Sequence, residues 1–111
     1  MNKRSLGSYY EQAVVEYLKD KGVTIIETNY FCKLGEIDII GIDGNTLVFF
    51  EVKYRKDNKY GNALEAVGIN KQKKIRKVAN YYTAYKNWNG LFRFDVVGIT
   101  GNNIDWISNA F

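Results

Sequence analysis

The amino-acid sequence predicts a single α/β domain over residues 1–111, with two main helices and five strands in the order α-β-β-β-α-β-β. Apolar residues recur at helical spacing in two stretches, whereas five other stretches are rich in β-branched and aromatic residues or alternate apolar with polar ones. Glycine, asparagine and aspartate separate these stretches, and proline is absent. Hydrophobic residues make up 46% of the chain and aromatic residues 15%, which is enough to build one core.

The first helix is predicted over the stretch SYYEQAVVEYLKDKG, in which Val14 and Leu18 share one helical face. Ser8 is the expected N-cap, because a serine hydroxyl satisfies the free amides at a helix start. Gly22 is the expected stop, because glycine favours the turn that follows a helix. Residues 23–29 then form the first predicted strand.

Two further strands, EIDIIGI and TLVFFEVKYR, are separated by Asp43, Gly44 and Asn45, which predicts a hairpin. The second helix is expected to begin near Asn70 and to end near Asn87. Its predicted buried side carries Ile75, Val78, Ala79, Tyr82 and Tyr85.

A second hairpin, formed by FRFDVVGI and IDWIS, is predicted at the end of the sequence, with its turn around Thr100 to Asn103. Arg93 and Asp95 lie on one face of its first strand and are expected to form a structural ion pair. Residues 62–67 are a candidate for a short extra helix.

Histidine is absent from the sequence, and cysteine occurs once, as Cys32. This composition excludes nucleophilic triads built on an imidazole base, zinc sites made of cysteine and histidine, and an intramolecular disulfide. Lys3 and Arg4 are not followed by the apolar run of a signal peptide, and no apolar segment approaches the roughly 20 residues that cross a bilayer. The sequence therefore predicts a cytoplasmic protein with no membrane-spanning segment.

An acidic pair is predicted where the second and third strands meet. Alternation places Glu51 on one face of the third strand, and it makes Asp38 face away from the two isoleucines that flank it. The turn decides whether the two acids meet. They are diagonal if Ile42 pairs with Asn45, directly opposite if Ile42 pairs with Leu47, and on different faces if the loop has an odd number of residues.

Two carboxylates held together on a partly buried sheet repel each other, and burial adds a desolvation cost to each. A bound cation removes both costs. Ligands that are all oxygen favour Mg²⁺ or Mn²⁺ over zinc, and Mg²⁺ is held by one or two carboxylates together with waters and substrate phosphate. Lys53 shares the strand face of Glu51 and can orient an attacking water or stabilise charge on the phosphate. Asp38, Glu51 and Lys53 therefore predict metal-assisted phosphodiester hydrolysis.

Glu11 is the candidate third acid, because it shares a helix face with Val14 and Leu18 and should point toward the core or a cleft. The stretch SYYE at residues 8–11 also fits a capping box, in which Glu11 would bond back to the amide of Ser8. Both interpretations use the same side chain, so the sequence leaves open whether Glu11 is a metal ligand or a helix cap.

The basic residues gather in one part of the chain. Sixteen lysines and arginines against twelve acids give a net charge of +4, and nine of the sixteen lie between Lys53 and Lys77. The segment NKQKKIRK begins near the positive end of the second helix, where phosphate contacts are favoured. The alternative is a solvated helix face that only adds solubility. We expect nucleic-acid contacts from Lys71, Gln72, Lys74, Arg55 and Lys56.

Several of these segments resemble known proteins. GEID at 35–38, followed by EVK at 51–53, resembles the divided catalytic motif of the PD-(D/E)XK nuclease superfamily, although Glu36 or Ile37 stands where that motif has proline. More closely, the sequence resembles the YraN-like family of small bacterial endonuclease-like proteins over nearly its whole length. The segments that carry this resemblance are GSYYEQAVVEYL, NYFCKLGEIDII, LVFFEVKYR, GNALEAVGINKQKKIRKVA and RFDVVGI.

The resemblance implies a restriction endonuclease-like α/β core around a mixed sheet. It implies that Asp38 and Glu51 are metal ligands, that Lys53 is the catalytic lysine and that Glu11 is an additional helical acid. Resemblance to junction-resolving nucleases further suggests branched or otherwise unusual DNA as the substrate, a 5′-phosphate product and a homodimer.

The sequence therefore predicts a Mg²⁺- or Mn²⁺-dependent endonuclease acting on DNA, with RNA left open. One alternative is a module that binds nucleic acid with little or no turnover, which would bind DNA independently of Asp38 and Glu51. Another is a toxin nuclease domain with an immunity partner, which would be toxic when expressed alone.

Overall fold

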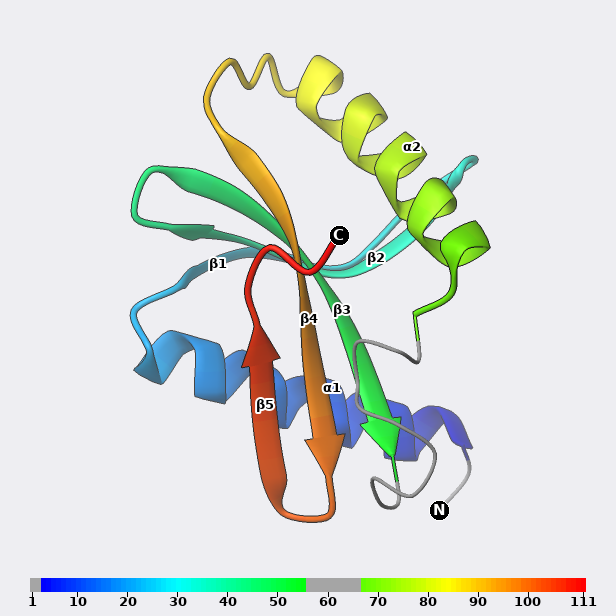
Figure 1. Ribbon diagram of the computed structural model, residues 1–111, viewed down its shortest axis with the longest axis vertical. Coiled ribbons are helices and arrows are strands. Elements are labelled where there is room, and N and C mark those ends of the chain that lie inside the picture. The colour runs from blue at the N-terminus through cyan, green and yellow to red at the C-terminus, as the bar shows by residue number, and fades with distance from the viewer. Residues whose placement is uncertain (1–2, 56–66) are drawn as a thin grey trace.

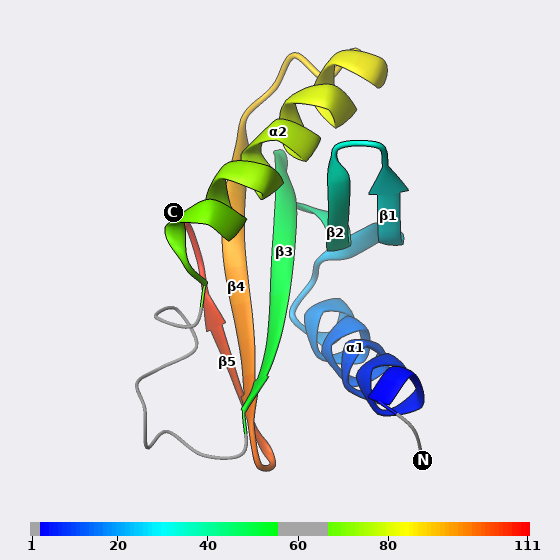
Figure 2. The same ribbon diagram turned by 90° about the vertical axis from the view of Figure 1, so that its right-hand side faces the viewer.

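A five-stranded mixed sheet forms the centre of the computed structural model, which describes residues 3–55 and 67–111. The elements are α1 (Lys3–Asp20), β1 (Thr24–Cys32), β2 (Gly35–Asp43), β3 (Thr46–Arg55), α2 (Ile69–Tyr85), β4 (Phe92–Thr100) and β5 (Asn103–Ile107). Their order confirms the predicted fold class. α1 covers one face of the sheet and α2 covers the other, as Figure 1 and Figure 2 show.

The strands lie in the sheet in the order of the sequence. β1, β2 and β3 form an antiparallel meander, β3 pairs with β4 in parallel, and β4 pairs antiparallel with β5. A parallel pair needs a crossover connection, and α2 lies within the connection from β3 to β4. The turn between β2 and β3 consists of Gly44 and Asn45, and Gly44 has φ 65°, a left-handed conformation that glycine adopts without strain.

Each helix packs an apolar face against its own side of the sheet. The core under α1 contains Val14, Val15, Leu18, Ile39, Val48, Phe50, Val97 and Ile99. The core under α2 contains Ile37, Ile40, Leu47, Phe49, Ile75, Val78, Ala79, Tyr82 and Phe94. Alternate residues of β3 therefore face different cores, and the alternation places Glu51 on the α2 side of the sheet.

Three local predictions were wrong. α1 begins at Lys3, so Ser8 lies within the helix and is not its N-cap. The helix extends further because the lysine, arginine and leucine before Ser8 have high helix propensity and no proline interrupts them. Tyr85 is 67% exposed, because it ends α2 and its ring stacks on Tyr81 outside the core. β1 continues to Cys32, beyond its predicted end.

The remaining helix and strand predictions agree with the structure to within about two residues, as assignments of element ends usually do. The candidate short helix over residues 62–67 lies outside the described residues, except for Val67, which packs against Val96. In the described ranges, neither helix is long and apolar enough to cross a bilayer.

Candidate active site

The predicted acidic pair lies at the end of the β2–β3 ladder. Ile42 pairs with Leu47, and continuing this register places Asp38 directly opposite Glu51. This is the second of the three arrangements that the sequence allowed. The Asp38 carboxylate accepts a hydrogen bond of 2.8 Å from the Val52 amide, which fixes it to the backbone of β3 beside Glu51.

The neighbouring strand β1 is irregular at the same level. Asn29 lies opposite Asp38, between the residues of β1 that pair with Ile37 and Ile39, and has φ 53°, a left-handed conformation. Ile37 packs under α2, whereas Ile39 packs under α1, so strict alternation fails along this part of β2. The prediction that Asp38 faces away from both isoleucines was therefore wrong, because the two isoleucines face opposite sides of the sheet.

Glu51 is almost completely buried, with 5% of its surface exposed. The Nζ atoms of Lys53 and Lys71 each lie 3.9 Å from its Oε1, one from the same strand and one from the first turn of α2. Burial and then the charge of Asp38 raise the pKa of Glu51 to about 7, against the opposing charges of the two lysines. At 3.9 Å neither lysine donates a hydrogen bond to this oxygen, so they compensate the buried charge only in part.

The pKa of Asp38 is also raised, chiefly by burial. The hydrogen bond from the Val52 amide and the charge of Lys71 act in the opposite direction. Both members of the pair are therefore carboxyl groups whose charged form the protein alone stabilises poorly.

Glu11 approaches the pair from α1. With the Asn29 amide oriented so that its nitrogen faces Glu11, this nitrogen lies 3.1 Å from both carboxylate oxygens. Burial and then the charge of Asp38 raise the pKa of Glu11, while the hydrogen bond from Asn29 lowers it. Because Ser8 lies within α1, Glu11 cannot be the glutamate of a capping box. Of the two interpretations that the sequence left open, the one that remains is an additional acid near Asp38.

Asn29 is a site residue that the sequence analysis missed. Asparagine is uncommon within strands, and it tolerates left-handed backbone better than most residues. These two properties were the only signal in the sequence. They indicate an irregular strand, and the contact with Glu11 required the structure.

The donor set fits a hard divalent cation. Asp38, Glu51 and Glu11 offer only carboxylate oxygens, and a nearby cation would stabilise the charged form of each. Within residues 3–55 and 67–111, no three acidic or cysteine side chains are gathered closely enough to hold an ion by themselves. A pair of carboxylates completed by waters and a phosphate matches the usual coordination of Mg²⁺, so Asp38 and Glu51 are the residues that would hold it.

The predicted nucleic-acid contacts differ in their surroundings. Lys71 lies at the acidic pair, with its Nζ 3.9 Å from Glu51 Oε1. Gln72 donates a hydrogen bond of 3.0 Å from Nε2 to the Val67 carbonyl, which anchors the start of α2. The N-cap of α2 is Gly68, which has no side chain to satisfy the first amides of the helix. The other predicted contacts are the exposed Lys74, the half-buried Arg55 and Lys56, which lies outside the described residues.

The fold and the site together define a small α/β protein that carries a carboxylate pair and two lysines at the end of the β2–β3 ladder. A family model described as "Uncharacterised protein family UPF0102" matches residues 10–99, and the chain belongs to this family. The resemblance to the YraN-like family is thereby confirmed.

Relatives named UPF0102 protein align with nearly the full length of the chain. The relative from Pseudoalteromonas translucida is 46% identical, over 99% of this chain and 93% of its own length. The relative from Caldicellulosiruptor saccharolyticus is 45% identical over the whole of both chains, and that from Fusobacterium nucleatum is 46% identical over 98% and 92%. These names state no activity.

Proposed function

We propose that the protein is an endonuclease that uses Mg²⁺ or Mn²⁺ to hydrolyse phosphodiester bonds in DNA. One observation carries the proposal: Glu51 is buried beside Asp38, its pKa is raised to about 7, and Lys53 and Lys71 approach it at 3.9 Å. A carboxylate pair that needs a cation, bordered by lysines that suit a phosphate, fits metal-assisted hydrolysis. The preference for branched or unusual DNA comes from the resemblance to junction-resolving nucleases alone.

Each residue of the site has a role in this chemistry. Asp38 and Glu51 would hold the metal ion, which would supply Lewis acidity to the phosphate and lower the pKa of water. Lys53 lies beside Glu51, where it hydrogen-bonds the attacking water or the phosphate oxygen that gains negative charge. Water attacks phosphorus, the P–O3′ bond breaks, and the products are a 5′-phosphate and a 3′-hydroxyl that takes up a proton.

Two further groups act around the reacting phosphate. Lys71 and the first amides of α2 bind a phosphate, because a helix N-terminus and a lysine both attract anions. Glu11, held by Asn29, adds negative charge beside Asp38 and so favours the cation.

Cleavage of labelled single-stranded, duplex and four-way-junction DNA, with Mg²⁺, Mn²⁺ or EDTA, tests the proposal. The variants are Asp38→Asn and Lys53→Met, and the matched controls are Asp105→Asn, an exposed acid of β5, and Lys21→Met, an exposed lysine after α1. We expect metal-dependent cleavage that both site variants lose and both controls keep, with all four proteins folded by circular dichroism.

Absence of cleavage with every metal and substrate, or cleavage that survives Asp38→Asn, would contradict the proposal. DNA binding without cleavage, unaffected by either site variant, would instead favour the binding module.

A further inference from the structure

An open pocket of about 560 Å³ lies away from the acidic pair, between β1 and the C-terminal end of α2. Its lining includes Phe31 in β1, Lys33 just after β1, and Tyr81 and Tyr85 on α2. α2 rises about 1.5 Å per residue, so Tyr85 lies about 21 Å along the helix from Lys71 at the active site. None of the residues assigned to the active site lines this pocket.

The walls of the pocket are exposed aromatic rings. Phe31 is 75% exposed, and the rings of Tyr81 and Tyr85 stand parallel, with an interplanar angle of 5° and centroids 6.3 Å apart. Exposed aromatic rings that gather in one place commonly mark a binding surface. Parallel, accessible ring faces suit a flat ligand that stacks.

Glu27, one of the residues that line the pocket, has a buried carboxylate oxygen that lacks a partner in the part of the chain that the structure describes. Glu27 Oε2 is buried and accepts no hydrogen bond from the described residues. The Tyr82 hydroxyl donates a hydrogen bond to the Glu27 carboxylate, and burial together with this bond raises the pKa of Tyr82. A buried acceptor without a donor is costly, so Glu27 favours a ligand that brings an N–H group into the pocket.

Two lysines determine which ligand charge the pocket favours. Lys33 and Lys86 both line the pocket, and the Lys86 Nζ lies 5.5 Å from the centroid of the Tyr85 ring. Their positive charge disfavours an organic cation, the other common ligand of aromatic pockets that contain a carboxylate. Their charge favours a ligand that carries an anionic group next to its stacking ring.

We propose that this pocket binds an unpaired base of the DNA, with its exocyclic amine donating to Glu27 Oε2. Tyr81, Tyr85 and Phe31 stack on the base, and Lys33 and Lys86 contact the adjoining phosphates. Cytosine and adenine present an amine at the edge of the ring. Thymine has only an imino N–H flanked by two carbonyl oxygens, which the carboxylate repels, so it binds less well.

This inference rests on the proposed function, because the unpaired base belongs to the DNA that the active site cleaves. Lys74, Tyr81 and Tyr85 are spaced by seven and four residues, so they lie within about 40° of one another around α2. The face of α2 that carries these three residues extends from the pocket toward Lys71. The distance of about 21 Å equals roughly six nucleotides of a stacked strand, so the preferred substrate carries an unpaired segment of about that length.

Binding of a fluorescent duplex with a six-nucleotide tail of dC, dA or dT, compared with a blunt duplex, tests the inference in EDTA, where cleavage does not interfere. We expect the dC and dA tails to strengthen binding about tenfold over the blunt duplex, and the dT tail to have a smaller effect. Tyr85→Ala should lose the gain from the tail and leave binding of the blunt duplex unchanged. Glu27→Gln should remove the preference of dC over dT, because an amide can pair with either base.

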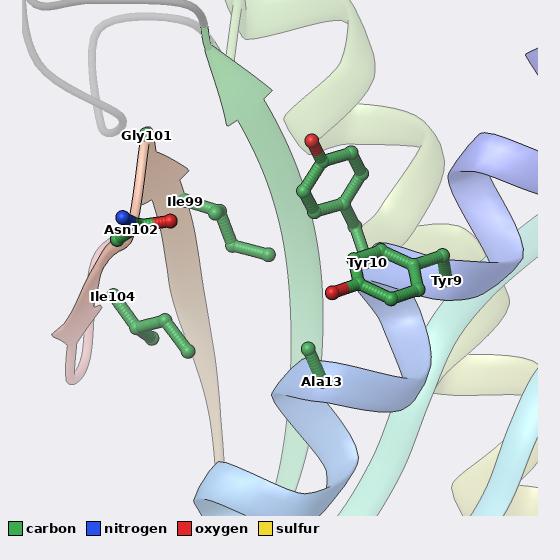
Figure 3. Close-up of a pocket in the computed structure, with 7 residues that line it drawn as sticks. All are labelled: Tyr9, Tyr10, Ala13, Ile99, Gly101, Asn102 and Ile104. Atoms are coloured by element: carbon green, nitrogen blue, oxygen red, sulfur yellow. The ribbon is translucent and has the colours of Figure 1, made fainter.

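The matched control is Tyr9→Ala. Tyr9 is an equally exposed tyrosine, 64% accessible, and lines a second pocket with Tyr10, Ala13, Ile99, Asn102 and Ile104. Figure 3 shows that the labelled side chains of this second pocket include no charged group, so it offers an aromatic ring without the carboxylate and lysines. Tyr9→Ala should bind every tail as the wild type does.

Tail binding that is unchanged in Tyr85→Ala, equal for dC and dT in the wild type, or absent altogether would overturn the pocket assignment. Metal-dependent cleavage lost in Asp38→Asn would in that case still support the proposed function. Tail binding that depends on Tyr85 without any cleavage would support the pocket and contradict the endonuclease.

Discussion

Two buried carboxylates on neighbouring strands, Asp95 of β4 and Glu51 of β3, differ in how their charge is compensated. Asp95 accepts hydrogen bonds from Trp106 Nε1 at 2.7 Å, from the Asn109 amide at 2.8 Å and from Arg93 Nε at 3.0 Å. Glu51 is almost as buried, yet its two lysines stay 3.9 Å away and its pKa is raised to about 7.

This difference shows that two acids buried to nearly the same depth can have very differently compensated charges. Asp95 belongs to a network with several donors, in which Arg93 also bonds Asp43 at 2.7 Å, and this confirms the predicted structural ion pair. The buried charge of Glu51 can be relieved by a proton or by a cation. We infer that incomplete compensation, rather than burial, marks the candidate active-site acid.

The largest expected effect is on cleavage. Glu51→Gln should reduce the rate about 1000-fold, equivalent to about 4 kcal/mol, because an amide is a poorer ligand for Mg²⁺ than a carboxylate. The rate is measured with the substrate that the wild type cleaves best. Asp95→Asn serves as the comparison and should keep the wild-type rate per folded molecule. A Glu51→Gln protein that retains its rate to within tenfold would remove the distinction between the two acids.

A smaller but substantial effect is expected on stability. Asp95→Asn should lower the free energy of unfolding by about 3 kcal/mol, because it leaves Arg93 and the other buried donors poorly matched. Urea denaturation followed by circular dichroism at neutral pH measures this change. A loss below about 1 kcal/mol would show that the network contributes no more than a surface ion pair.

The next effect is a change in stability that depends on pH. Here the substitution, Glu51→Gln, raises the free energy of unfolding instead of lowering it. The pKa of Glu51 is about 7 in the folded protein and near the ordinary 4.5 in the unfolded chain, so the folded state holds more protons between these values. Wild-type stability therefore falls as pH rises from 4.5 to 7, and Glu51→Gln should not show this part of the loss. The variant should be up to about 3 kcal/mol more stable than the wild type at pH 8, and nearly equal to it at pH 4.5.

Urea denaturation of both proteins at the two pH values measures this difference. At pH 8, Mn²⁺ should reduce the difference in the free energy of unfolding between the two proteins by stabilising the wild type. A ligand that binds only the folded state raises the stability of the protein. A wild type that is the more stable protein at pH 8 without metal would contradict the raised pKa.

The fold was predictable because its signals are local. Residues 46–55 form a strand with the predicted bounds, and the Gly44–Asn45 turn follows from common hairpin preferences. The position of Asp38 relative to Glu51 was predictable only as one of three arrangements. The sequence did not fix the length of the turn between the two strands, and the turn length decides which arrangement forms.

Other features depend on contacts between distant segments. Asn29 meets Glu11 only because β1 carries a left-handed residue beside α1, and Glu27 meets Tyr82 only because α2 returns over β1. Tyr85 fits the helical period of the buried face, but the helix ends there beyond the core. Local patterns therefore predicted the elements, whereas the site and the pocket needed the packing between them.

The smallest expected effect concerns the partial compensation of Glu51 by Lys71. Lys71→Met should weaken binding of duplex DNA about fivefold, or about 1 kcal/mol, because it removes one phosphate contact. The slope of log affinity against log salt concentration should become shallower by about 0.9, the value for one released counterion. Lys21→Met, which removes an exposed lysine remote from the acidic pair, should leave both the affinity and the slope near wild-type values. An unchanged slope in Lys71→Met would mean that Lys71 only compensates the buried Glu51 carboxylate, as Arg93 compensates Asp95, and does not contact DNA.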